Sequence, residues 1–241
     1  MCSSDLYVND AGRQMDILAL SAWLRYLELC GEQVAFPPNA YQGDYVRAMA
    51  TAMKQTRGEA LLHKAADVLA DTPSLPEDGG SDDEAKQQHE AYLDALIANA
   101  KRLLGEEWQY VHNYVLTEQL DDCREDLAEF GVHYEVWFSE KALFDAGLVE
   151  RCVARLESAG HIYLKNGAKW FRSTTFGDEK DRVVQRDNGL YTYFASDIAY
   201  HLNKYERGFD RMINIWGADH HGYIPRVKGS LQNLTDRKSV V

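Results

Sequence analysis

Apolar residues recur at helical spacing along much of the chain, and the first clear example lies between residues 10 and 31. Its apolar positions are Ile17, Leu20, Leu24 and Leu27. Because intervals of three and four residues place side chains on one face of a helix, the pattern predicts a helix here. Asp10 is a good N-cap, and Gly31 is a typical residue just past a helix end.

Further helical patterns follow, separated by segments rich in proline, glycine and acidic residues. Residues 44–56 predict a second helix, and residues 71–84 predict a loop that carries almost no large apolar side chain. Residues 85–131 are helical in pattern, with two apolar stripes. Residues 139–160 predict another helical stretch that begins with Ser139 as its N-cap.

The hydrophobic period then changes from helical to alternating. Residues 162–174 alternate around Asn166-Gly167, and residues 182–194 alternate around Asn188-Gly189. Both dipeptides are strong signals for the tight turn of a β-hairpin. The sequence therefore predicts two hairpins in this part of the chain.

The last patterned stretches predict a helix at residues 196–208 and a short buried strand at residues 211–217. Patterns of a helix-and-strand core thus stand at both ends of the chain, with a mainly helical block and hairpins between them. This order predicts an α/β domain that is split by a large insertion.

Composition limits the class of protein. The chain has 241 residues and an ordinary hydrophobic content of 45%, and no apolar run is as long as a membrane span, which indicates a soluble protein. A net charge of −12 argues against broad, non-specific binding of nucleic acid but leaves room for a local basic groove. The cysteines form no CxxC pair and fit no zinc pattern, which indicates reduced thiols in a cytosolic protein. They are Cys2, Cys30, Cys123 and Cys152.

The two ends of the chain look foreign to the rest. Residues 1–6 and 236–241 read like translated ends of a sequencing adapter, so we expect the native segment to run from about Tyr7 to Thr235. No signal peptide is expected, and both natural termini are expected to lie outside this chain.

A polar cluster follows the expected strand at residues 211–217. Gly217 would let the backbone approach a ligand, Asp219 could accept two ribose hydroxyls, and His220 and His221 could donate to phosphate or substrate. A polar surface loop with two exposed histidines is about equally compatible with this pattern. A zinc site is disfavoured, because adjacent histidines point in divergent directions.

Two more clusters contain polar groups near the start of a helix. Tyr193 and Asp197 are four residues apart, so both can face one side of a helix and bind a planar cation such as a guanidinium. Taken alone, Asp197 fits better as an acid that stabilises the first helical turn, where acids are favoured. Asn9 and Gln14 flank Asp10 at a strand-to-helix junction, where a ligand role and a simple helix cap are about equally supported.

The last candidate for a functional site is a run of mixed charge at residues 178–182. Asp178, Glu179, Lys180, Asp181 and Arg182 predict a solvated turn with ion pairs.

Taken together, several stretches in this order resemble arginyl-tRNA synthetase, a class I aminoacyl-tRNA synthetase. The resemblance covers nearly all of residues 7–232 and is weakest at residues 54–104. The stretches are YVNDAGRQM, YQGDYV, REDLAEFGVHYEVWFSE, GAKWFRSTTFGDEKDRVV, YTYFASDIAYHLNKYERGFDR and WGADHHGYIPRVKGSLQ.

The resemblance implies a Rossmann-like catalytic core that a connective insertion divides. It places the end of the first half of the core at residues 7–34, the mainly helical insertion with hairpins at residues 35–186, and the second half at residues 187–235. It also implies a cytoplasmic, monomeric enzyme without a membrane segment.

The resemblance further implies activation of arginine with ATP and its ligation to tRNA(Arg). It assigns arginine binding to Tyr193, Asp197, His220, Asn9 and Gln14. It assigns the ATP side of the site to Gly217, Asp219 and His221, with Asp219 on the ribose. No metal-ligating residues and no tightly bound cofactor are implied, because Mg²⁺ enters with ATP and takes most of its ligands from phosphates and water.

Two family motifs are expected outside this chain, the HIGH-type ATP motif before Tyr7 and the KMSKS-type loop after Gln232. The helical anticodon-binding domain is also expected beyond Gln232, so the chain alone should be inactive. Two alternatives stay open. One is another class I synthetase, for example for glutamate or cysteine, against which the pair Tyr193 and Asp197 argues. The other is a non-catalytic interaction domain descended from a synthetase.

Overall fold

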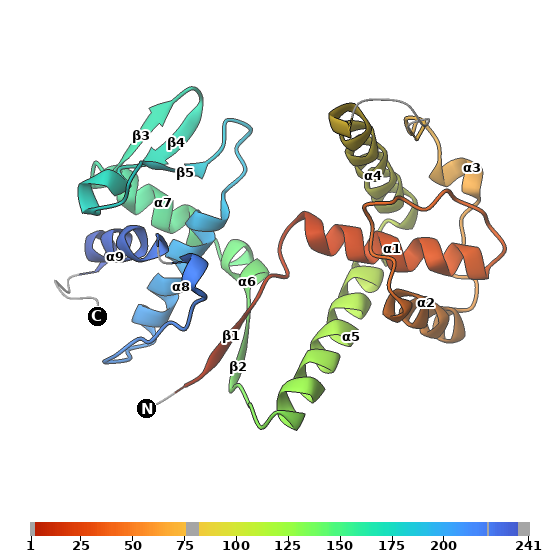
Figure 1. Cartoon of the computed structure of the whole chain (residues 1–241), viewed down its shortest axis with the longest axis horizontal. Coiled ribbons are helices and arrows are strands. Elements are labelled where there is room, and N and C mark those ends of the chain that lie inside the picture. Colours follow the sequence, from red (N-terminus) through yellow and green to blue (C-terminus); the bar gives the residue numbers. More distant parts are fainter. Residues whose placement is uncertain (1–2, 76–81, 221, 236–241) are drawn as a thin grey trace. The chain divides into compact units, whose positions relative to one another are not determined.

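The structure is a computed structural model that describes residues 3–75, 82–220 and 222–235, which form two compact units (Figure 1). The helical unit is Asp10–His133. The mixed unit combines the N-terminal segment up to Asn9 with the chain from Tyr134 onwards. Each unit has its own core of buried apolar residues.

The helical unit contains only helices and connecting segments among its described residues. The helices are α1 (Arg13–Leu29), α2 (Asp44–Arg57), α3 (Ala65–Val68), α4 (Asp82–Leu104) and α5 (Glu107–Glu129). The predicted helices at 10–31, 44–56 and 85–131 are confirmed, the last as α4 and α5 with a break at Gly105, whose φ is 54°. Of the predicted loop at 71–84, residues 76–81 lie outside the described part, and α4 begins at Asp82.

Helix α1 is the centre of the helical unit. Its side chains are apolar nearly all the way round from Ile17 to Leu27, and α2, α4 and α5 pack against it (Figure 1). The fully buried Trp23 donates from Nε1 to the Leu61 carbonyl at 2.9 Å, and Tyr26 donates to the Gly58 carbonyl at 2.7 Å. These bonds satisfy the polar ends of two large side chains that would otherwise be costly to bury.

The sequence predicted the C-terminal end of α1 correctly but not its N-terminal end. Gly31 is confirmed as the residue past the helix, because its φ is 92° and the Glu32 and Gly31 amides donate to Leu27 and Glu28, each at 3.0 Å. The prediction of Asp10 as N-cap is wrong. Gly12 holds that position with a φ of 100°, a backbone angle that suits glycine, and no side chain caps the helix.

The mixed unit contains two sheets among its described residues. Strands β1 (Asp5–Val8) and β2 (Val136–Ser139) pair in parallel, with Tyr7 opposite Phe138. Strands β3 (Ile162–Lys165), β4 (Ala168–Phe171) and β5 (Arg182–Gln185) form an antiparallel sheet in that order. Strand β1 includes Asp5 and Leu6, from the range that looked foreign in the sequence.

Helices flank these sheets in the mixed unit. They are α6 (Glu140–Asp145), α7 (Leu148–Ser158), α8 (Tyr193–Glu206) and α9 (Tyr223–Leu234), with short 3₁₀ turns η1 (Ser173–Phe176) and η2 (Ala218–His220). Ser139 is confirmed as the cap of α6, since its hydroxyl accepts from the Ala142 amide at 3.1 Å. The core lies among α7, α8, the inner face of the antiparallel sheet and the end of α9.

One predicted hairpin forms in full and the other in part. Asn166 and Gly167 both have positive φ, 51° and 79°, and join β3 to β4 as expected. After β5, the turn at Asn188-Gly189 is present, but only one isolated bridge forms among the described residues there, between Gln185 and Tyr191.

The predicted strand at residues 211–217 is wrong, because this segment has no regular secondary structure. Ile213 and Ile215 are 69% and 95% exposed. A strand exists only through hydrogen bonds to a neighbouring strand, and β1 and β2, the parallel strands of the described residues, pair only with each other.

The sequence also led us to expect that residues 7–32 would pack with residues 187–232. Helix α1 instead lies in the helical unit, because its apolar surface is buried by α2, α4 and α5. Only the start of that range, Tyr7–Asn9, lies in the mixed unit. A mixed fold of helices and strands is thus present, while the assignment of residue ranges to a catalytic core and an insertion stays a prediction. No described helix combines the length and the apolar character that crossing a membrane requires.

The packing of α1 leads to a test of stability. Replacing Trp23 with alanine is expected to lower the free energy of unfolding by about 3–5 kcal/mol, because it leaves a cavity and removes a buried hydrogen bond. Urea denaturation followed by circular dichroism measures the change. Leu29→Ala, on the same helix but 45% exposed, is the control and should change stability by less than about 0.5 kcal/mol. Equal losses in both variants would contradict this packing.

Candidate functional site

The candidate site lies in the mixed unit at the N-terminal half of α8. Phe194, Ile198 and Leu202 bury one face of this helix in the core. Their spacing turns Tyr193 and Asp197 to another face, where Tyr193 is 64% exposed and Asp197 is partly buried. The expectation that both residues share one side of a helix is therefore confirmed.

A second carboxylate, Glu140, lies beside Asp197. Glu140 is the first residue of α6 and is 2% exposed. Its Oε1 atom accepts a hydrogen bond from the Ser196 hydroxyl at 2.7 Å, which ties α6 to α8 next to Asp197. Glu140 was not singled out from the sequence, because an acid directly after a helix cap is also what the first turn of any helix favours.

The two carboxylates interact strongly with each other and with a buried phenol. Burial first, and then the negative charge of Glu140, raise the pKa of Asp197 to about 7, although interactions with His220 and Arg226 act in the opposite direction. Burial, followed by the charge of Glu140, also raises the pKa of the Tyr7 hydroxyl on β1. The cluster thus contains two carboxylates and two phenols. Asp197 and Tyr193 lie in the first turns of α8, Glu140 begins α6, and Tyr7 lies on β1. Such a group favours a cation, which would relieve the repulsion between the acids.

His220 is the predicted site residue after Trp216 that the structure describes beside this cluster. His220 ends η2, and its ring lies 5.7 Å from the Tyr223 ring and 6.4 Å from the Trp216 ring. Its effect on the pKa of Asp197 shows that it stands near that carboxylate. The Gly217 carbonyl accepts from the His220 amide at 3.0 Å, which shapes the turn.

The structure gives no contact between this cluster and the other predicted site residues as far as they are described. Asp219 is described only by its backbone in η2, and His221 lies outside the described residues. Asn9 is exposed at the end of its segment in the mixed unit. Gln14 lies in the helical unit, where its side-chain oxygen accepts from Tyr41 at 3.0 Å. The ligand roles of these residues stay predictions.

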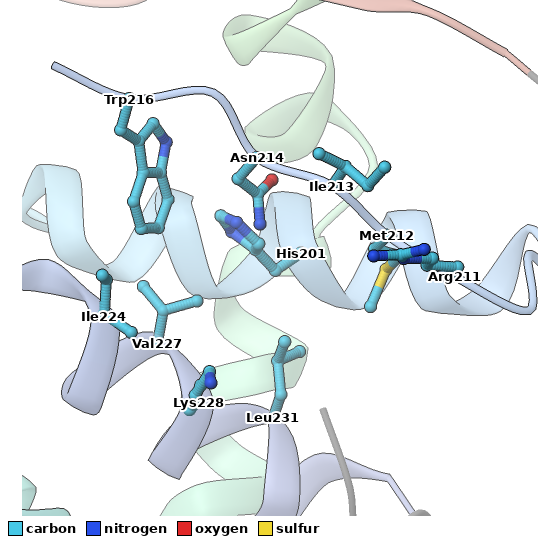
Figure 2. Close-up of a pocket in the computed structure, with 10 residues that line it drawn as sticks. All are labelled: His201, Arg211, Met212, Ile213, Asn214, Trp216, Ile224, Val227, Lys228 and Leu231. Carbon is cyan, nitrogen blue, oxygen red and sulfur yellow. The ribbon is translucent and has the colours of Figure 1, made fainter. Parts of the chain in front are cut away.

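A cavity of about 320 Å³ lies next to the cluster, between α8, α9 and the segment before η2 (Figure 2). Trp216, Asn214 and His201 point toward one another across it (Figure 2). Most of its wall is apolar. The lining residues are His201, Arg211, Met212, Ile213, Asn214, Trp216, Ile224, Val227, Lys228 and Leu231.

His201 forms the inner wall of this cavity and connects it to the acidic cluster. Its Nδ1 lies 2.7 Å from the Asp197 carbonyl, and because a carbonyl only accepts, Nδ1 carries the proton. Burial lowers the pKa of His201 to about 4, so the ring is neutral at neutral pH. Arg211 and Lys228 also line the cavity, so its wall combines apolar side chains, a neutral imidazole and two cationic groups.

The charged run at residues 178–182 is only in part the solvated turn that the sequence predicted, because Glu179 and Lys180 are exposed but Asp178 is buried. The Asp178 side chain is only 3% exposed and pairs with Arg182 at 2.8 Å and with Arg226 at 3.1 Å. Asp181 accepts from the Thr174 hydroxyl at 2.8 Å and from Tyr163 at 2.9 Å. Ion pairs are thus present as expected, but they are buried and tie this turn to α9. In the part of the chain that the structure describes, no group of three or more His, Cys, Asp or Glu could hold a metal ion.

Comparison with known proteins gives consistent relatives over nearly the whole chain. An arginine–tRNA ligase from Dechloromonas aromatica is 70% identical over 230 residues, which are 95% of this chain and 39% of that protein. An arginine–tRNA ligase from Nitrosospira multiformis is 62% identical over 230 residues, 95% of this chain and 38% of that protein. No family model matches the chain.

A solved structure gives the same result for the fold. The structure named as an arginyl-tRNA synthetase from Campylobacter jejuni matches 95% of this chain and 42% of its own, with a TM-score of 0.72 and 29% sequence identity. These matches define the class that the chain resembles as the aminoacyl-tRNA ligases. Within that class it is similar to arginine–tRNA ligase, so the resemblance to arginyl-tRNA synthetase that the motifs indicated is confirmed. The chain spans 39% of the length of the curated relatives it matches.

The raised pKa of Asp197 makes stability depend on pH in a definite direction. Its pKa in the folded chain is about 7, above the value near 3.9 of an unfolded chain, so the folded state binds the proton more tightly. This contribution is present below pH 4 and is lost as the pH rises through 7. Asp197→Asn removes the buried charge and should stabilise the chain at pH 8 by on the order of 2 kcal/mol, with little effect near pH 4.

Thermal denaturation at pH 4 and pH 8 measures this difference. Asp145→Asn is the control, because this exposed carboxylate of α6 pairs with Lys141 at the surface and should contribute less than about 1 kcal/mol at either pH. A stability gain for Asp197→Asn that is the same at both pH values would contradict the assigned pKa.

Proposed function

We propose that this chain provides the arginine pocket of an enzyme that activates arginine with ATP and ligates it to tRNA(Arg). The observation that carries the proposal is the pair of carboxylates, the buried Glu140 and the partly buried Asp197, in a chain 70% identical to an arginine–tRNA ligase. A guanidinium is planar, always charged and rich in donors, and it therefore matches two carboxylates better than an ammonium does.

In this proposal each side chain of the cluster has a separate task. Asp197 and Glu140 accept hydrogen bonds from the substrate guanidinium, and the exposed Tyr193 phenol closes the pocket from the side. Ser196 orients Glu140 through its 2.7 Å hydrogen bond. His220 stands next to Asp197 and, as the family resemblance implies, contacts the amino end of the substrate. Asn9 and Gln14 are assigned to arginine as well.

The ATP side of the proposed site is the turn after Trp216. Gly217, Asp219 and His221 are assigned to ATP, with Asp219 on the ribose hydroxyls, and the turn follows the expected end of a Rossmann-like core strand. The arginine carboxylate attacks the α-phosphate of ATP, which yields an aminoacyl adenylate and pyrophosphate. The site contributes mainly by placing both substrates and by neutralising charge. Mg²⁺ is proposed to accompany ATP and to draw most of its ligands from phosphates and water.

The proposal includes the setting in which such an enzyme works. Its partners are arginine, ATP and tRNA(Arg), its location is the cytoplasm, and it acts as a monomer. The catalytic core is the Rossmann-like domain that the resemblance implies, divided by a connective insertion. A synthetase for glutamate would need a cationic pocket in place of Glu140 and Asp197, so the acidic pair argues against that alternative.

A hybrid ligase tests the proposal in a complete enzyme. In it, residues 7–235 of this chain replace the segment they match in the Dechloromonas aromatica ligase. The hybrid should exchange pyrophosphate with ATP in the presence of tRNA(Arg) when arginine is supplied, and not when glutamate or cysteine is supplied. Exchange that depends on another amino acid, or none with arginine, would contradict the proposal.

Variants of the hybrid ligase test the two carboxylates. Asp197→Asn and Glu140→Gln should each raise the KM for arginine by about 10–100-fold, because a hydrogen bond to a charged group contributes roughly 1.5–3 kcal/mol. The KM for ATP should change far less. Asp145→Asn removes an exposed carboxylate of the same unit and serves as control. An unchanged arginine KM in both variants would exclude this pocket.

A further inference from the structure

Asp178 is a buried carboxylate that the proposed reaction does not use. Its two oxygens accept two hydrogen bonds from Arg182, both at 2.8 Å, and one from the Glu179 amide at 2.8 Å. Its Oδ2 atom also lies 3.1 Å from Nε of Arg226, whose side chain is 10% exposed. Asp178 therefore joins the turn before β5 to α9 through two arginines.

Arg226 brings a guanidinium close to the proposed arginine pocket. Helix α9 packs against α8, which carries Asp197. The Arg226 guanidinium stacks 4.4 Å from the centre of the Tyr223 ring, and its Nε also donates to the Gly222 carbonyl at 3.2 Å. Burial raises the pKa of Asp197 and the pKa of Tyr223, and the positive charge of Arg226 opposes the rise in both, as expected for a guanidinium on a helix packed against α8.

This arrangement contains a competitor for the substrate. A pocket that binds the guanidinium of arginine would also bind the guanidinium of an arginine side chain that can reach it. A side chain tethered next to the pocket acts at a high effective concentration, on the order of millimolar or above. The pocket stays open only if Arg226 has a better partner than Asp197 and Glu140, and Asp178 is such a partner.

We propose that Asp178 is a positioning residue for arginine binding, which pairs with Arg226 and so keeps this guanidinium away from Glu140 and Asp197. The inference rests on the proposed function, because it assumes that those two carboxylates bind the substrate. Burial strengthens the pairing, since the Asp178 carboxylate has little water to compete for its charge.

The test uses the hybrid ligase and a double variant. Asp178→Asn keeps the size of the side chain but removes its charge, so Arg226 turns to the acidic pair and the KM for arginine rises about tenfold, with kcat and the KM for ATP nearly unchanged. Adding Arg226→Gln removes the competitor. The double variant should then return the arginine KM to within about threefold of the unsubstituted hybrid.

Arg182→Gln is the matched control, because it breaks the other ion pair of the same carboxylate and leaves the Arg226 pair in place. Its arginine KM should stay within about threefold of the unsubstituted hybrid. If Asp178 only stabilised the fold, Arg182→Gln would resemble Asp178→Asn, and Arg226→Gln would make the defect worse rather than restore binding. Thermal denaturation of all four proteins separates loss of folding from loss of arginine binding.

The outcomes for the two proposals differ. An unsubstituted hybrid without arginine-dependent exchange would overturn the proposed function and this inference with it. An active hybrid in which Asp178→Asn leaves the arginine KM unchanged would overturn the inference alone. The inference alone is also overturned if Asp178→Asn raises the arginine KM and Arg226→Gln fails to restore it.

Discussion

Glu140 and Asp197 lie close together inside the mixed unit, and much of that unit follows from what such a pair requires. Each buried carboxylate loses contact with water, and each repels the other. The chain offsets this cost with a hydroxyl from Ser196 and with the positive charge of Arg226. In the proposed function, the remaining negative charge is what favours binding of a cation in the pocket.

The strand pairing explains how the pair is assembled. Strand β2 ends at Ser139, and the cap of α6 puts Glu140 directly at that end. Strand β1 pairs with β2 in parallel and brings Tyr7 to the same edge. The carboxyl end of parallel strands is where open α/β folds hold their ligands, so a polar pocket here agrees with the proposed adenylating site.

A second group of charged side chains, Asp178 with Arg182 and Arg226, lies between α9 and the turn before β5. Arg182 and Arg226 both form ion pairs with Asp178 there, and Arg226 lies on α9, which packs against the helix that carries Asp197. An enzyme that selects arginine has to bind this guanidinium while its own arginines stay elsewhere. In our proposal the buried Asp178 supplies a physical basis for that discrimination, because it pairs with Arg226 on α9.

The helical unit depends on a different constraint. Helix α1 is apolar on nearly all sides, and a helix of this kind has to be surrounded by others. Its three packing partners, α2, α4 and α5, meet that demand within residues 10–133. Family motifs at the start of α1 grouped it with the residues of the catalytic site, but the burial of its side chains decides its packing.

The amino-acid sequence by itself was enough to predict most of the helices, though not α3 or α9, as well as the turn at Asn166-Gly167, the cap at Ser139 and the shared face of Tyr193 and Asp197. All of these depend on residues within a few positions of one another. Glu140 was missed and Asp178 was misread as solvated, and the strand at 211–217 did not form. Whether an acid is buried, or a strand has a partner, depends on which distant segments meet. Only the tertiary structure decides that, because burial and strand pairing are properties of the assembled unit and not of any local pattern.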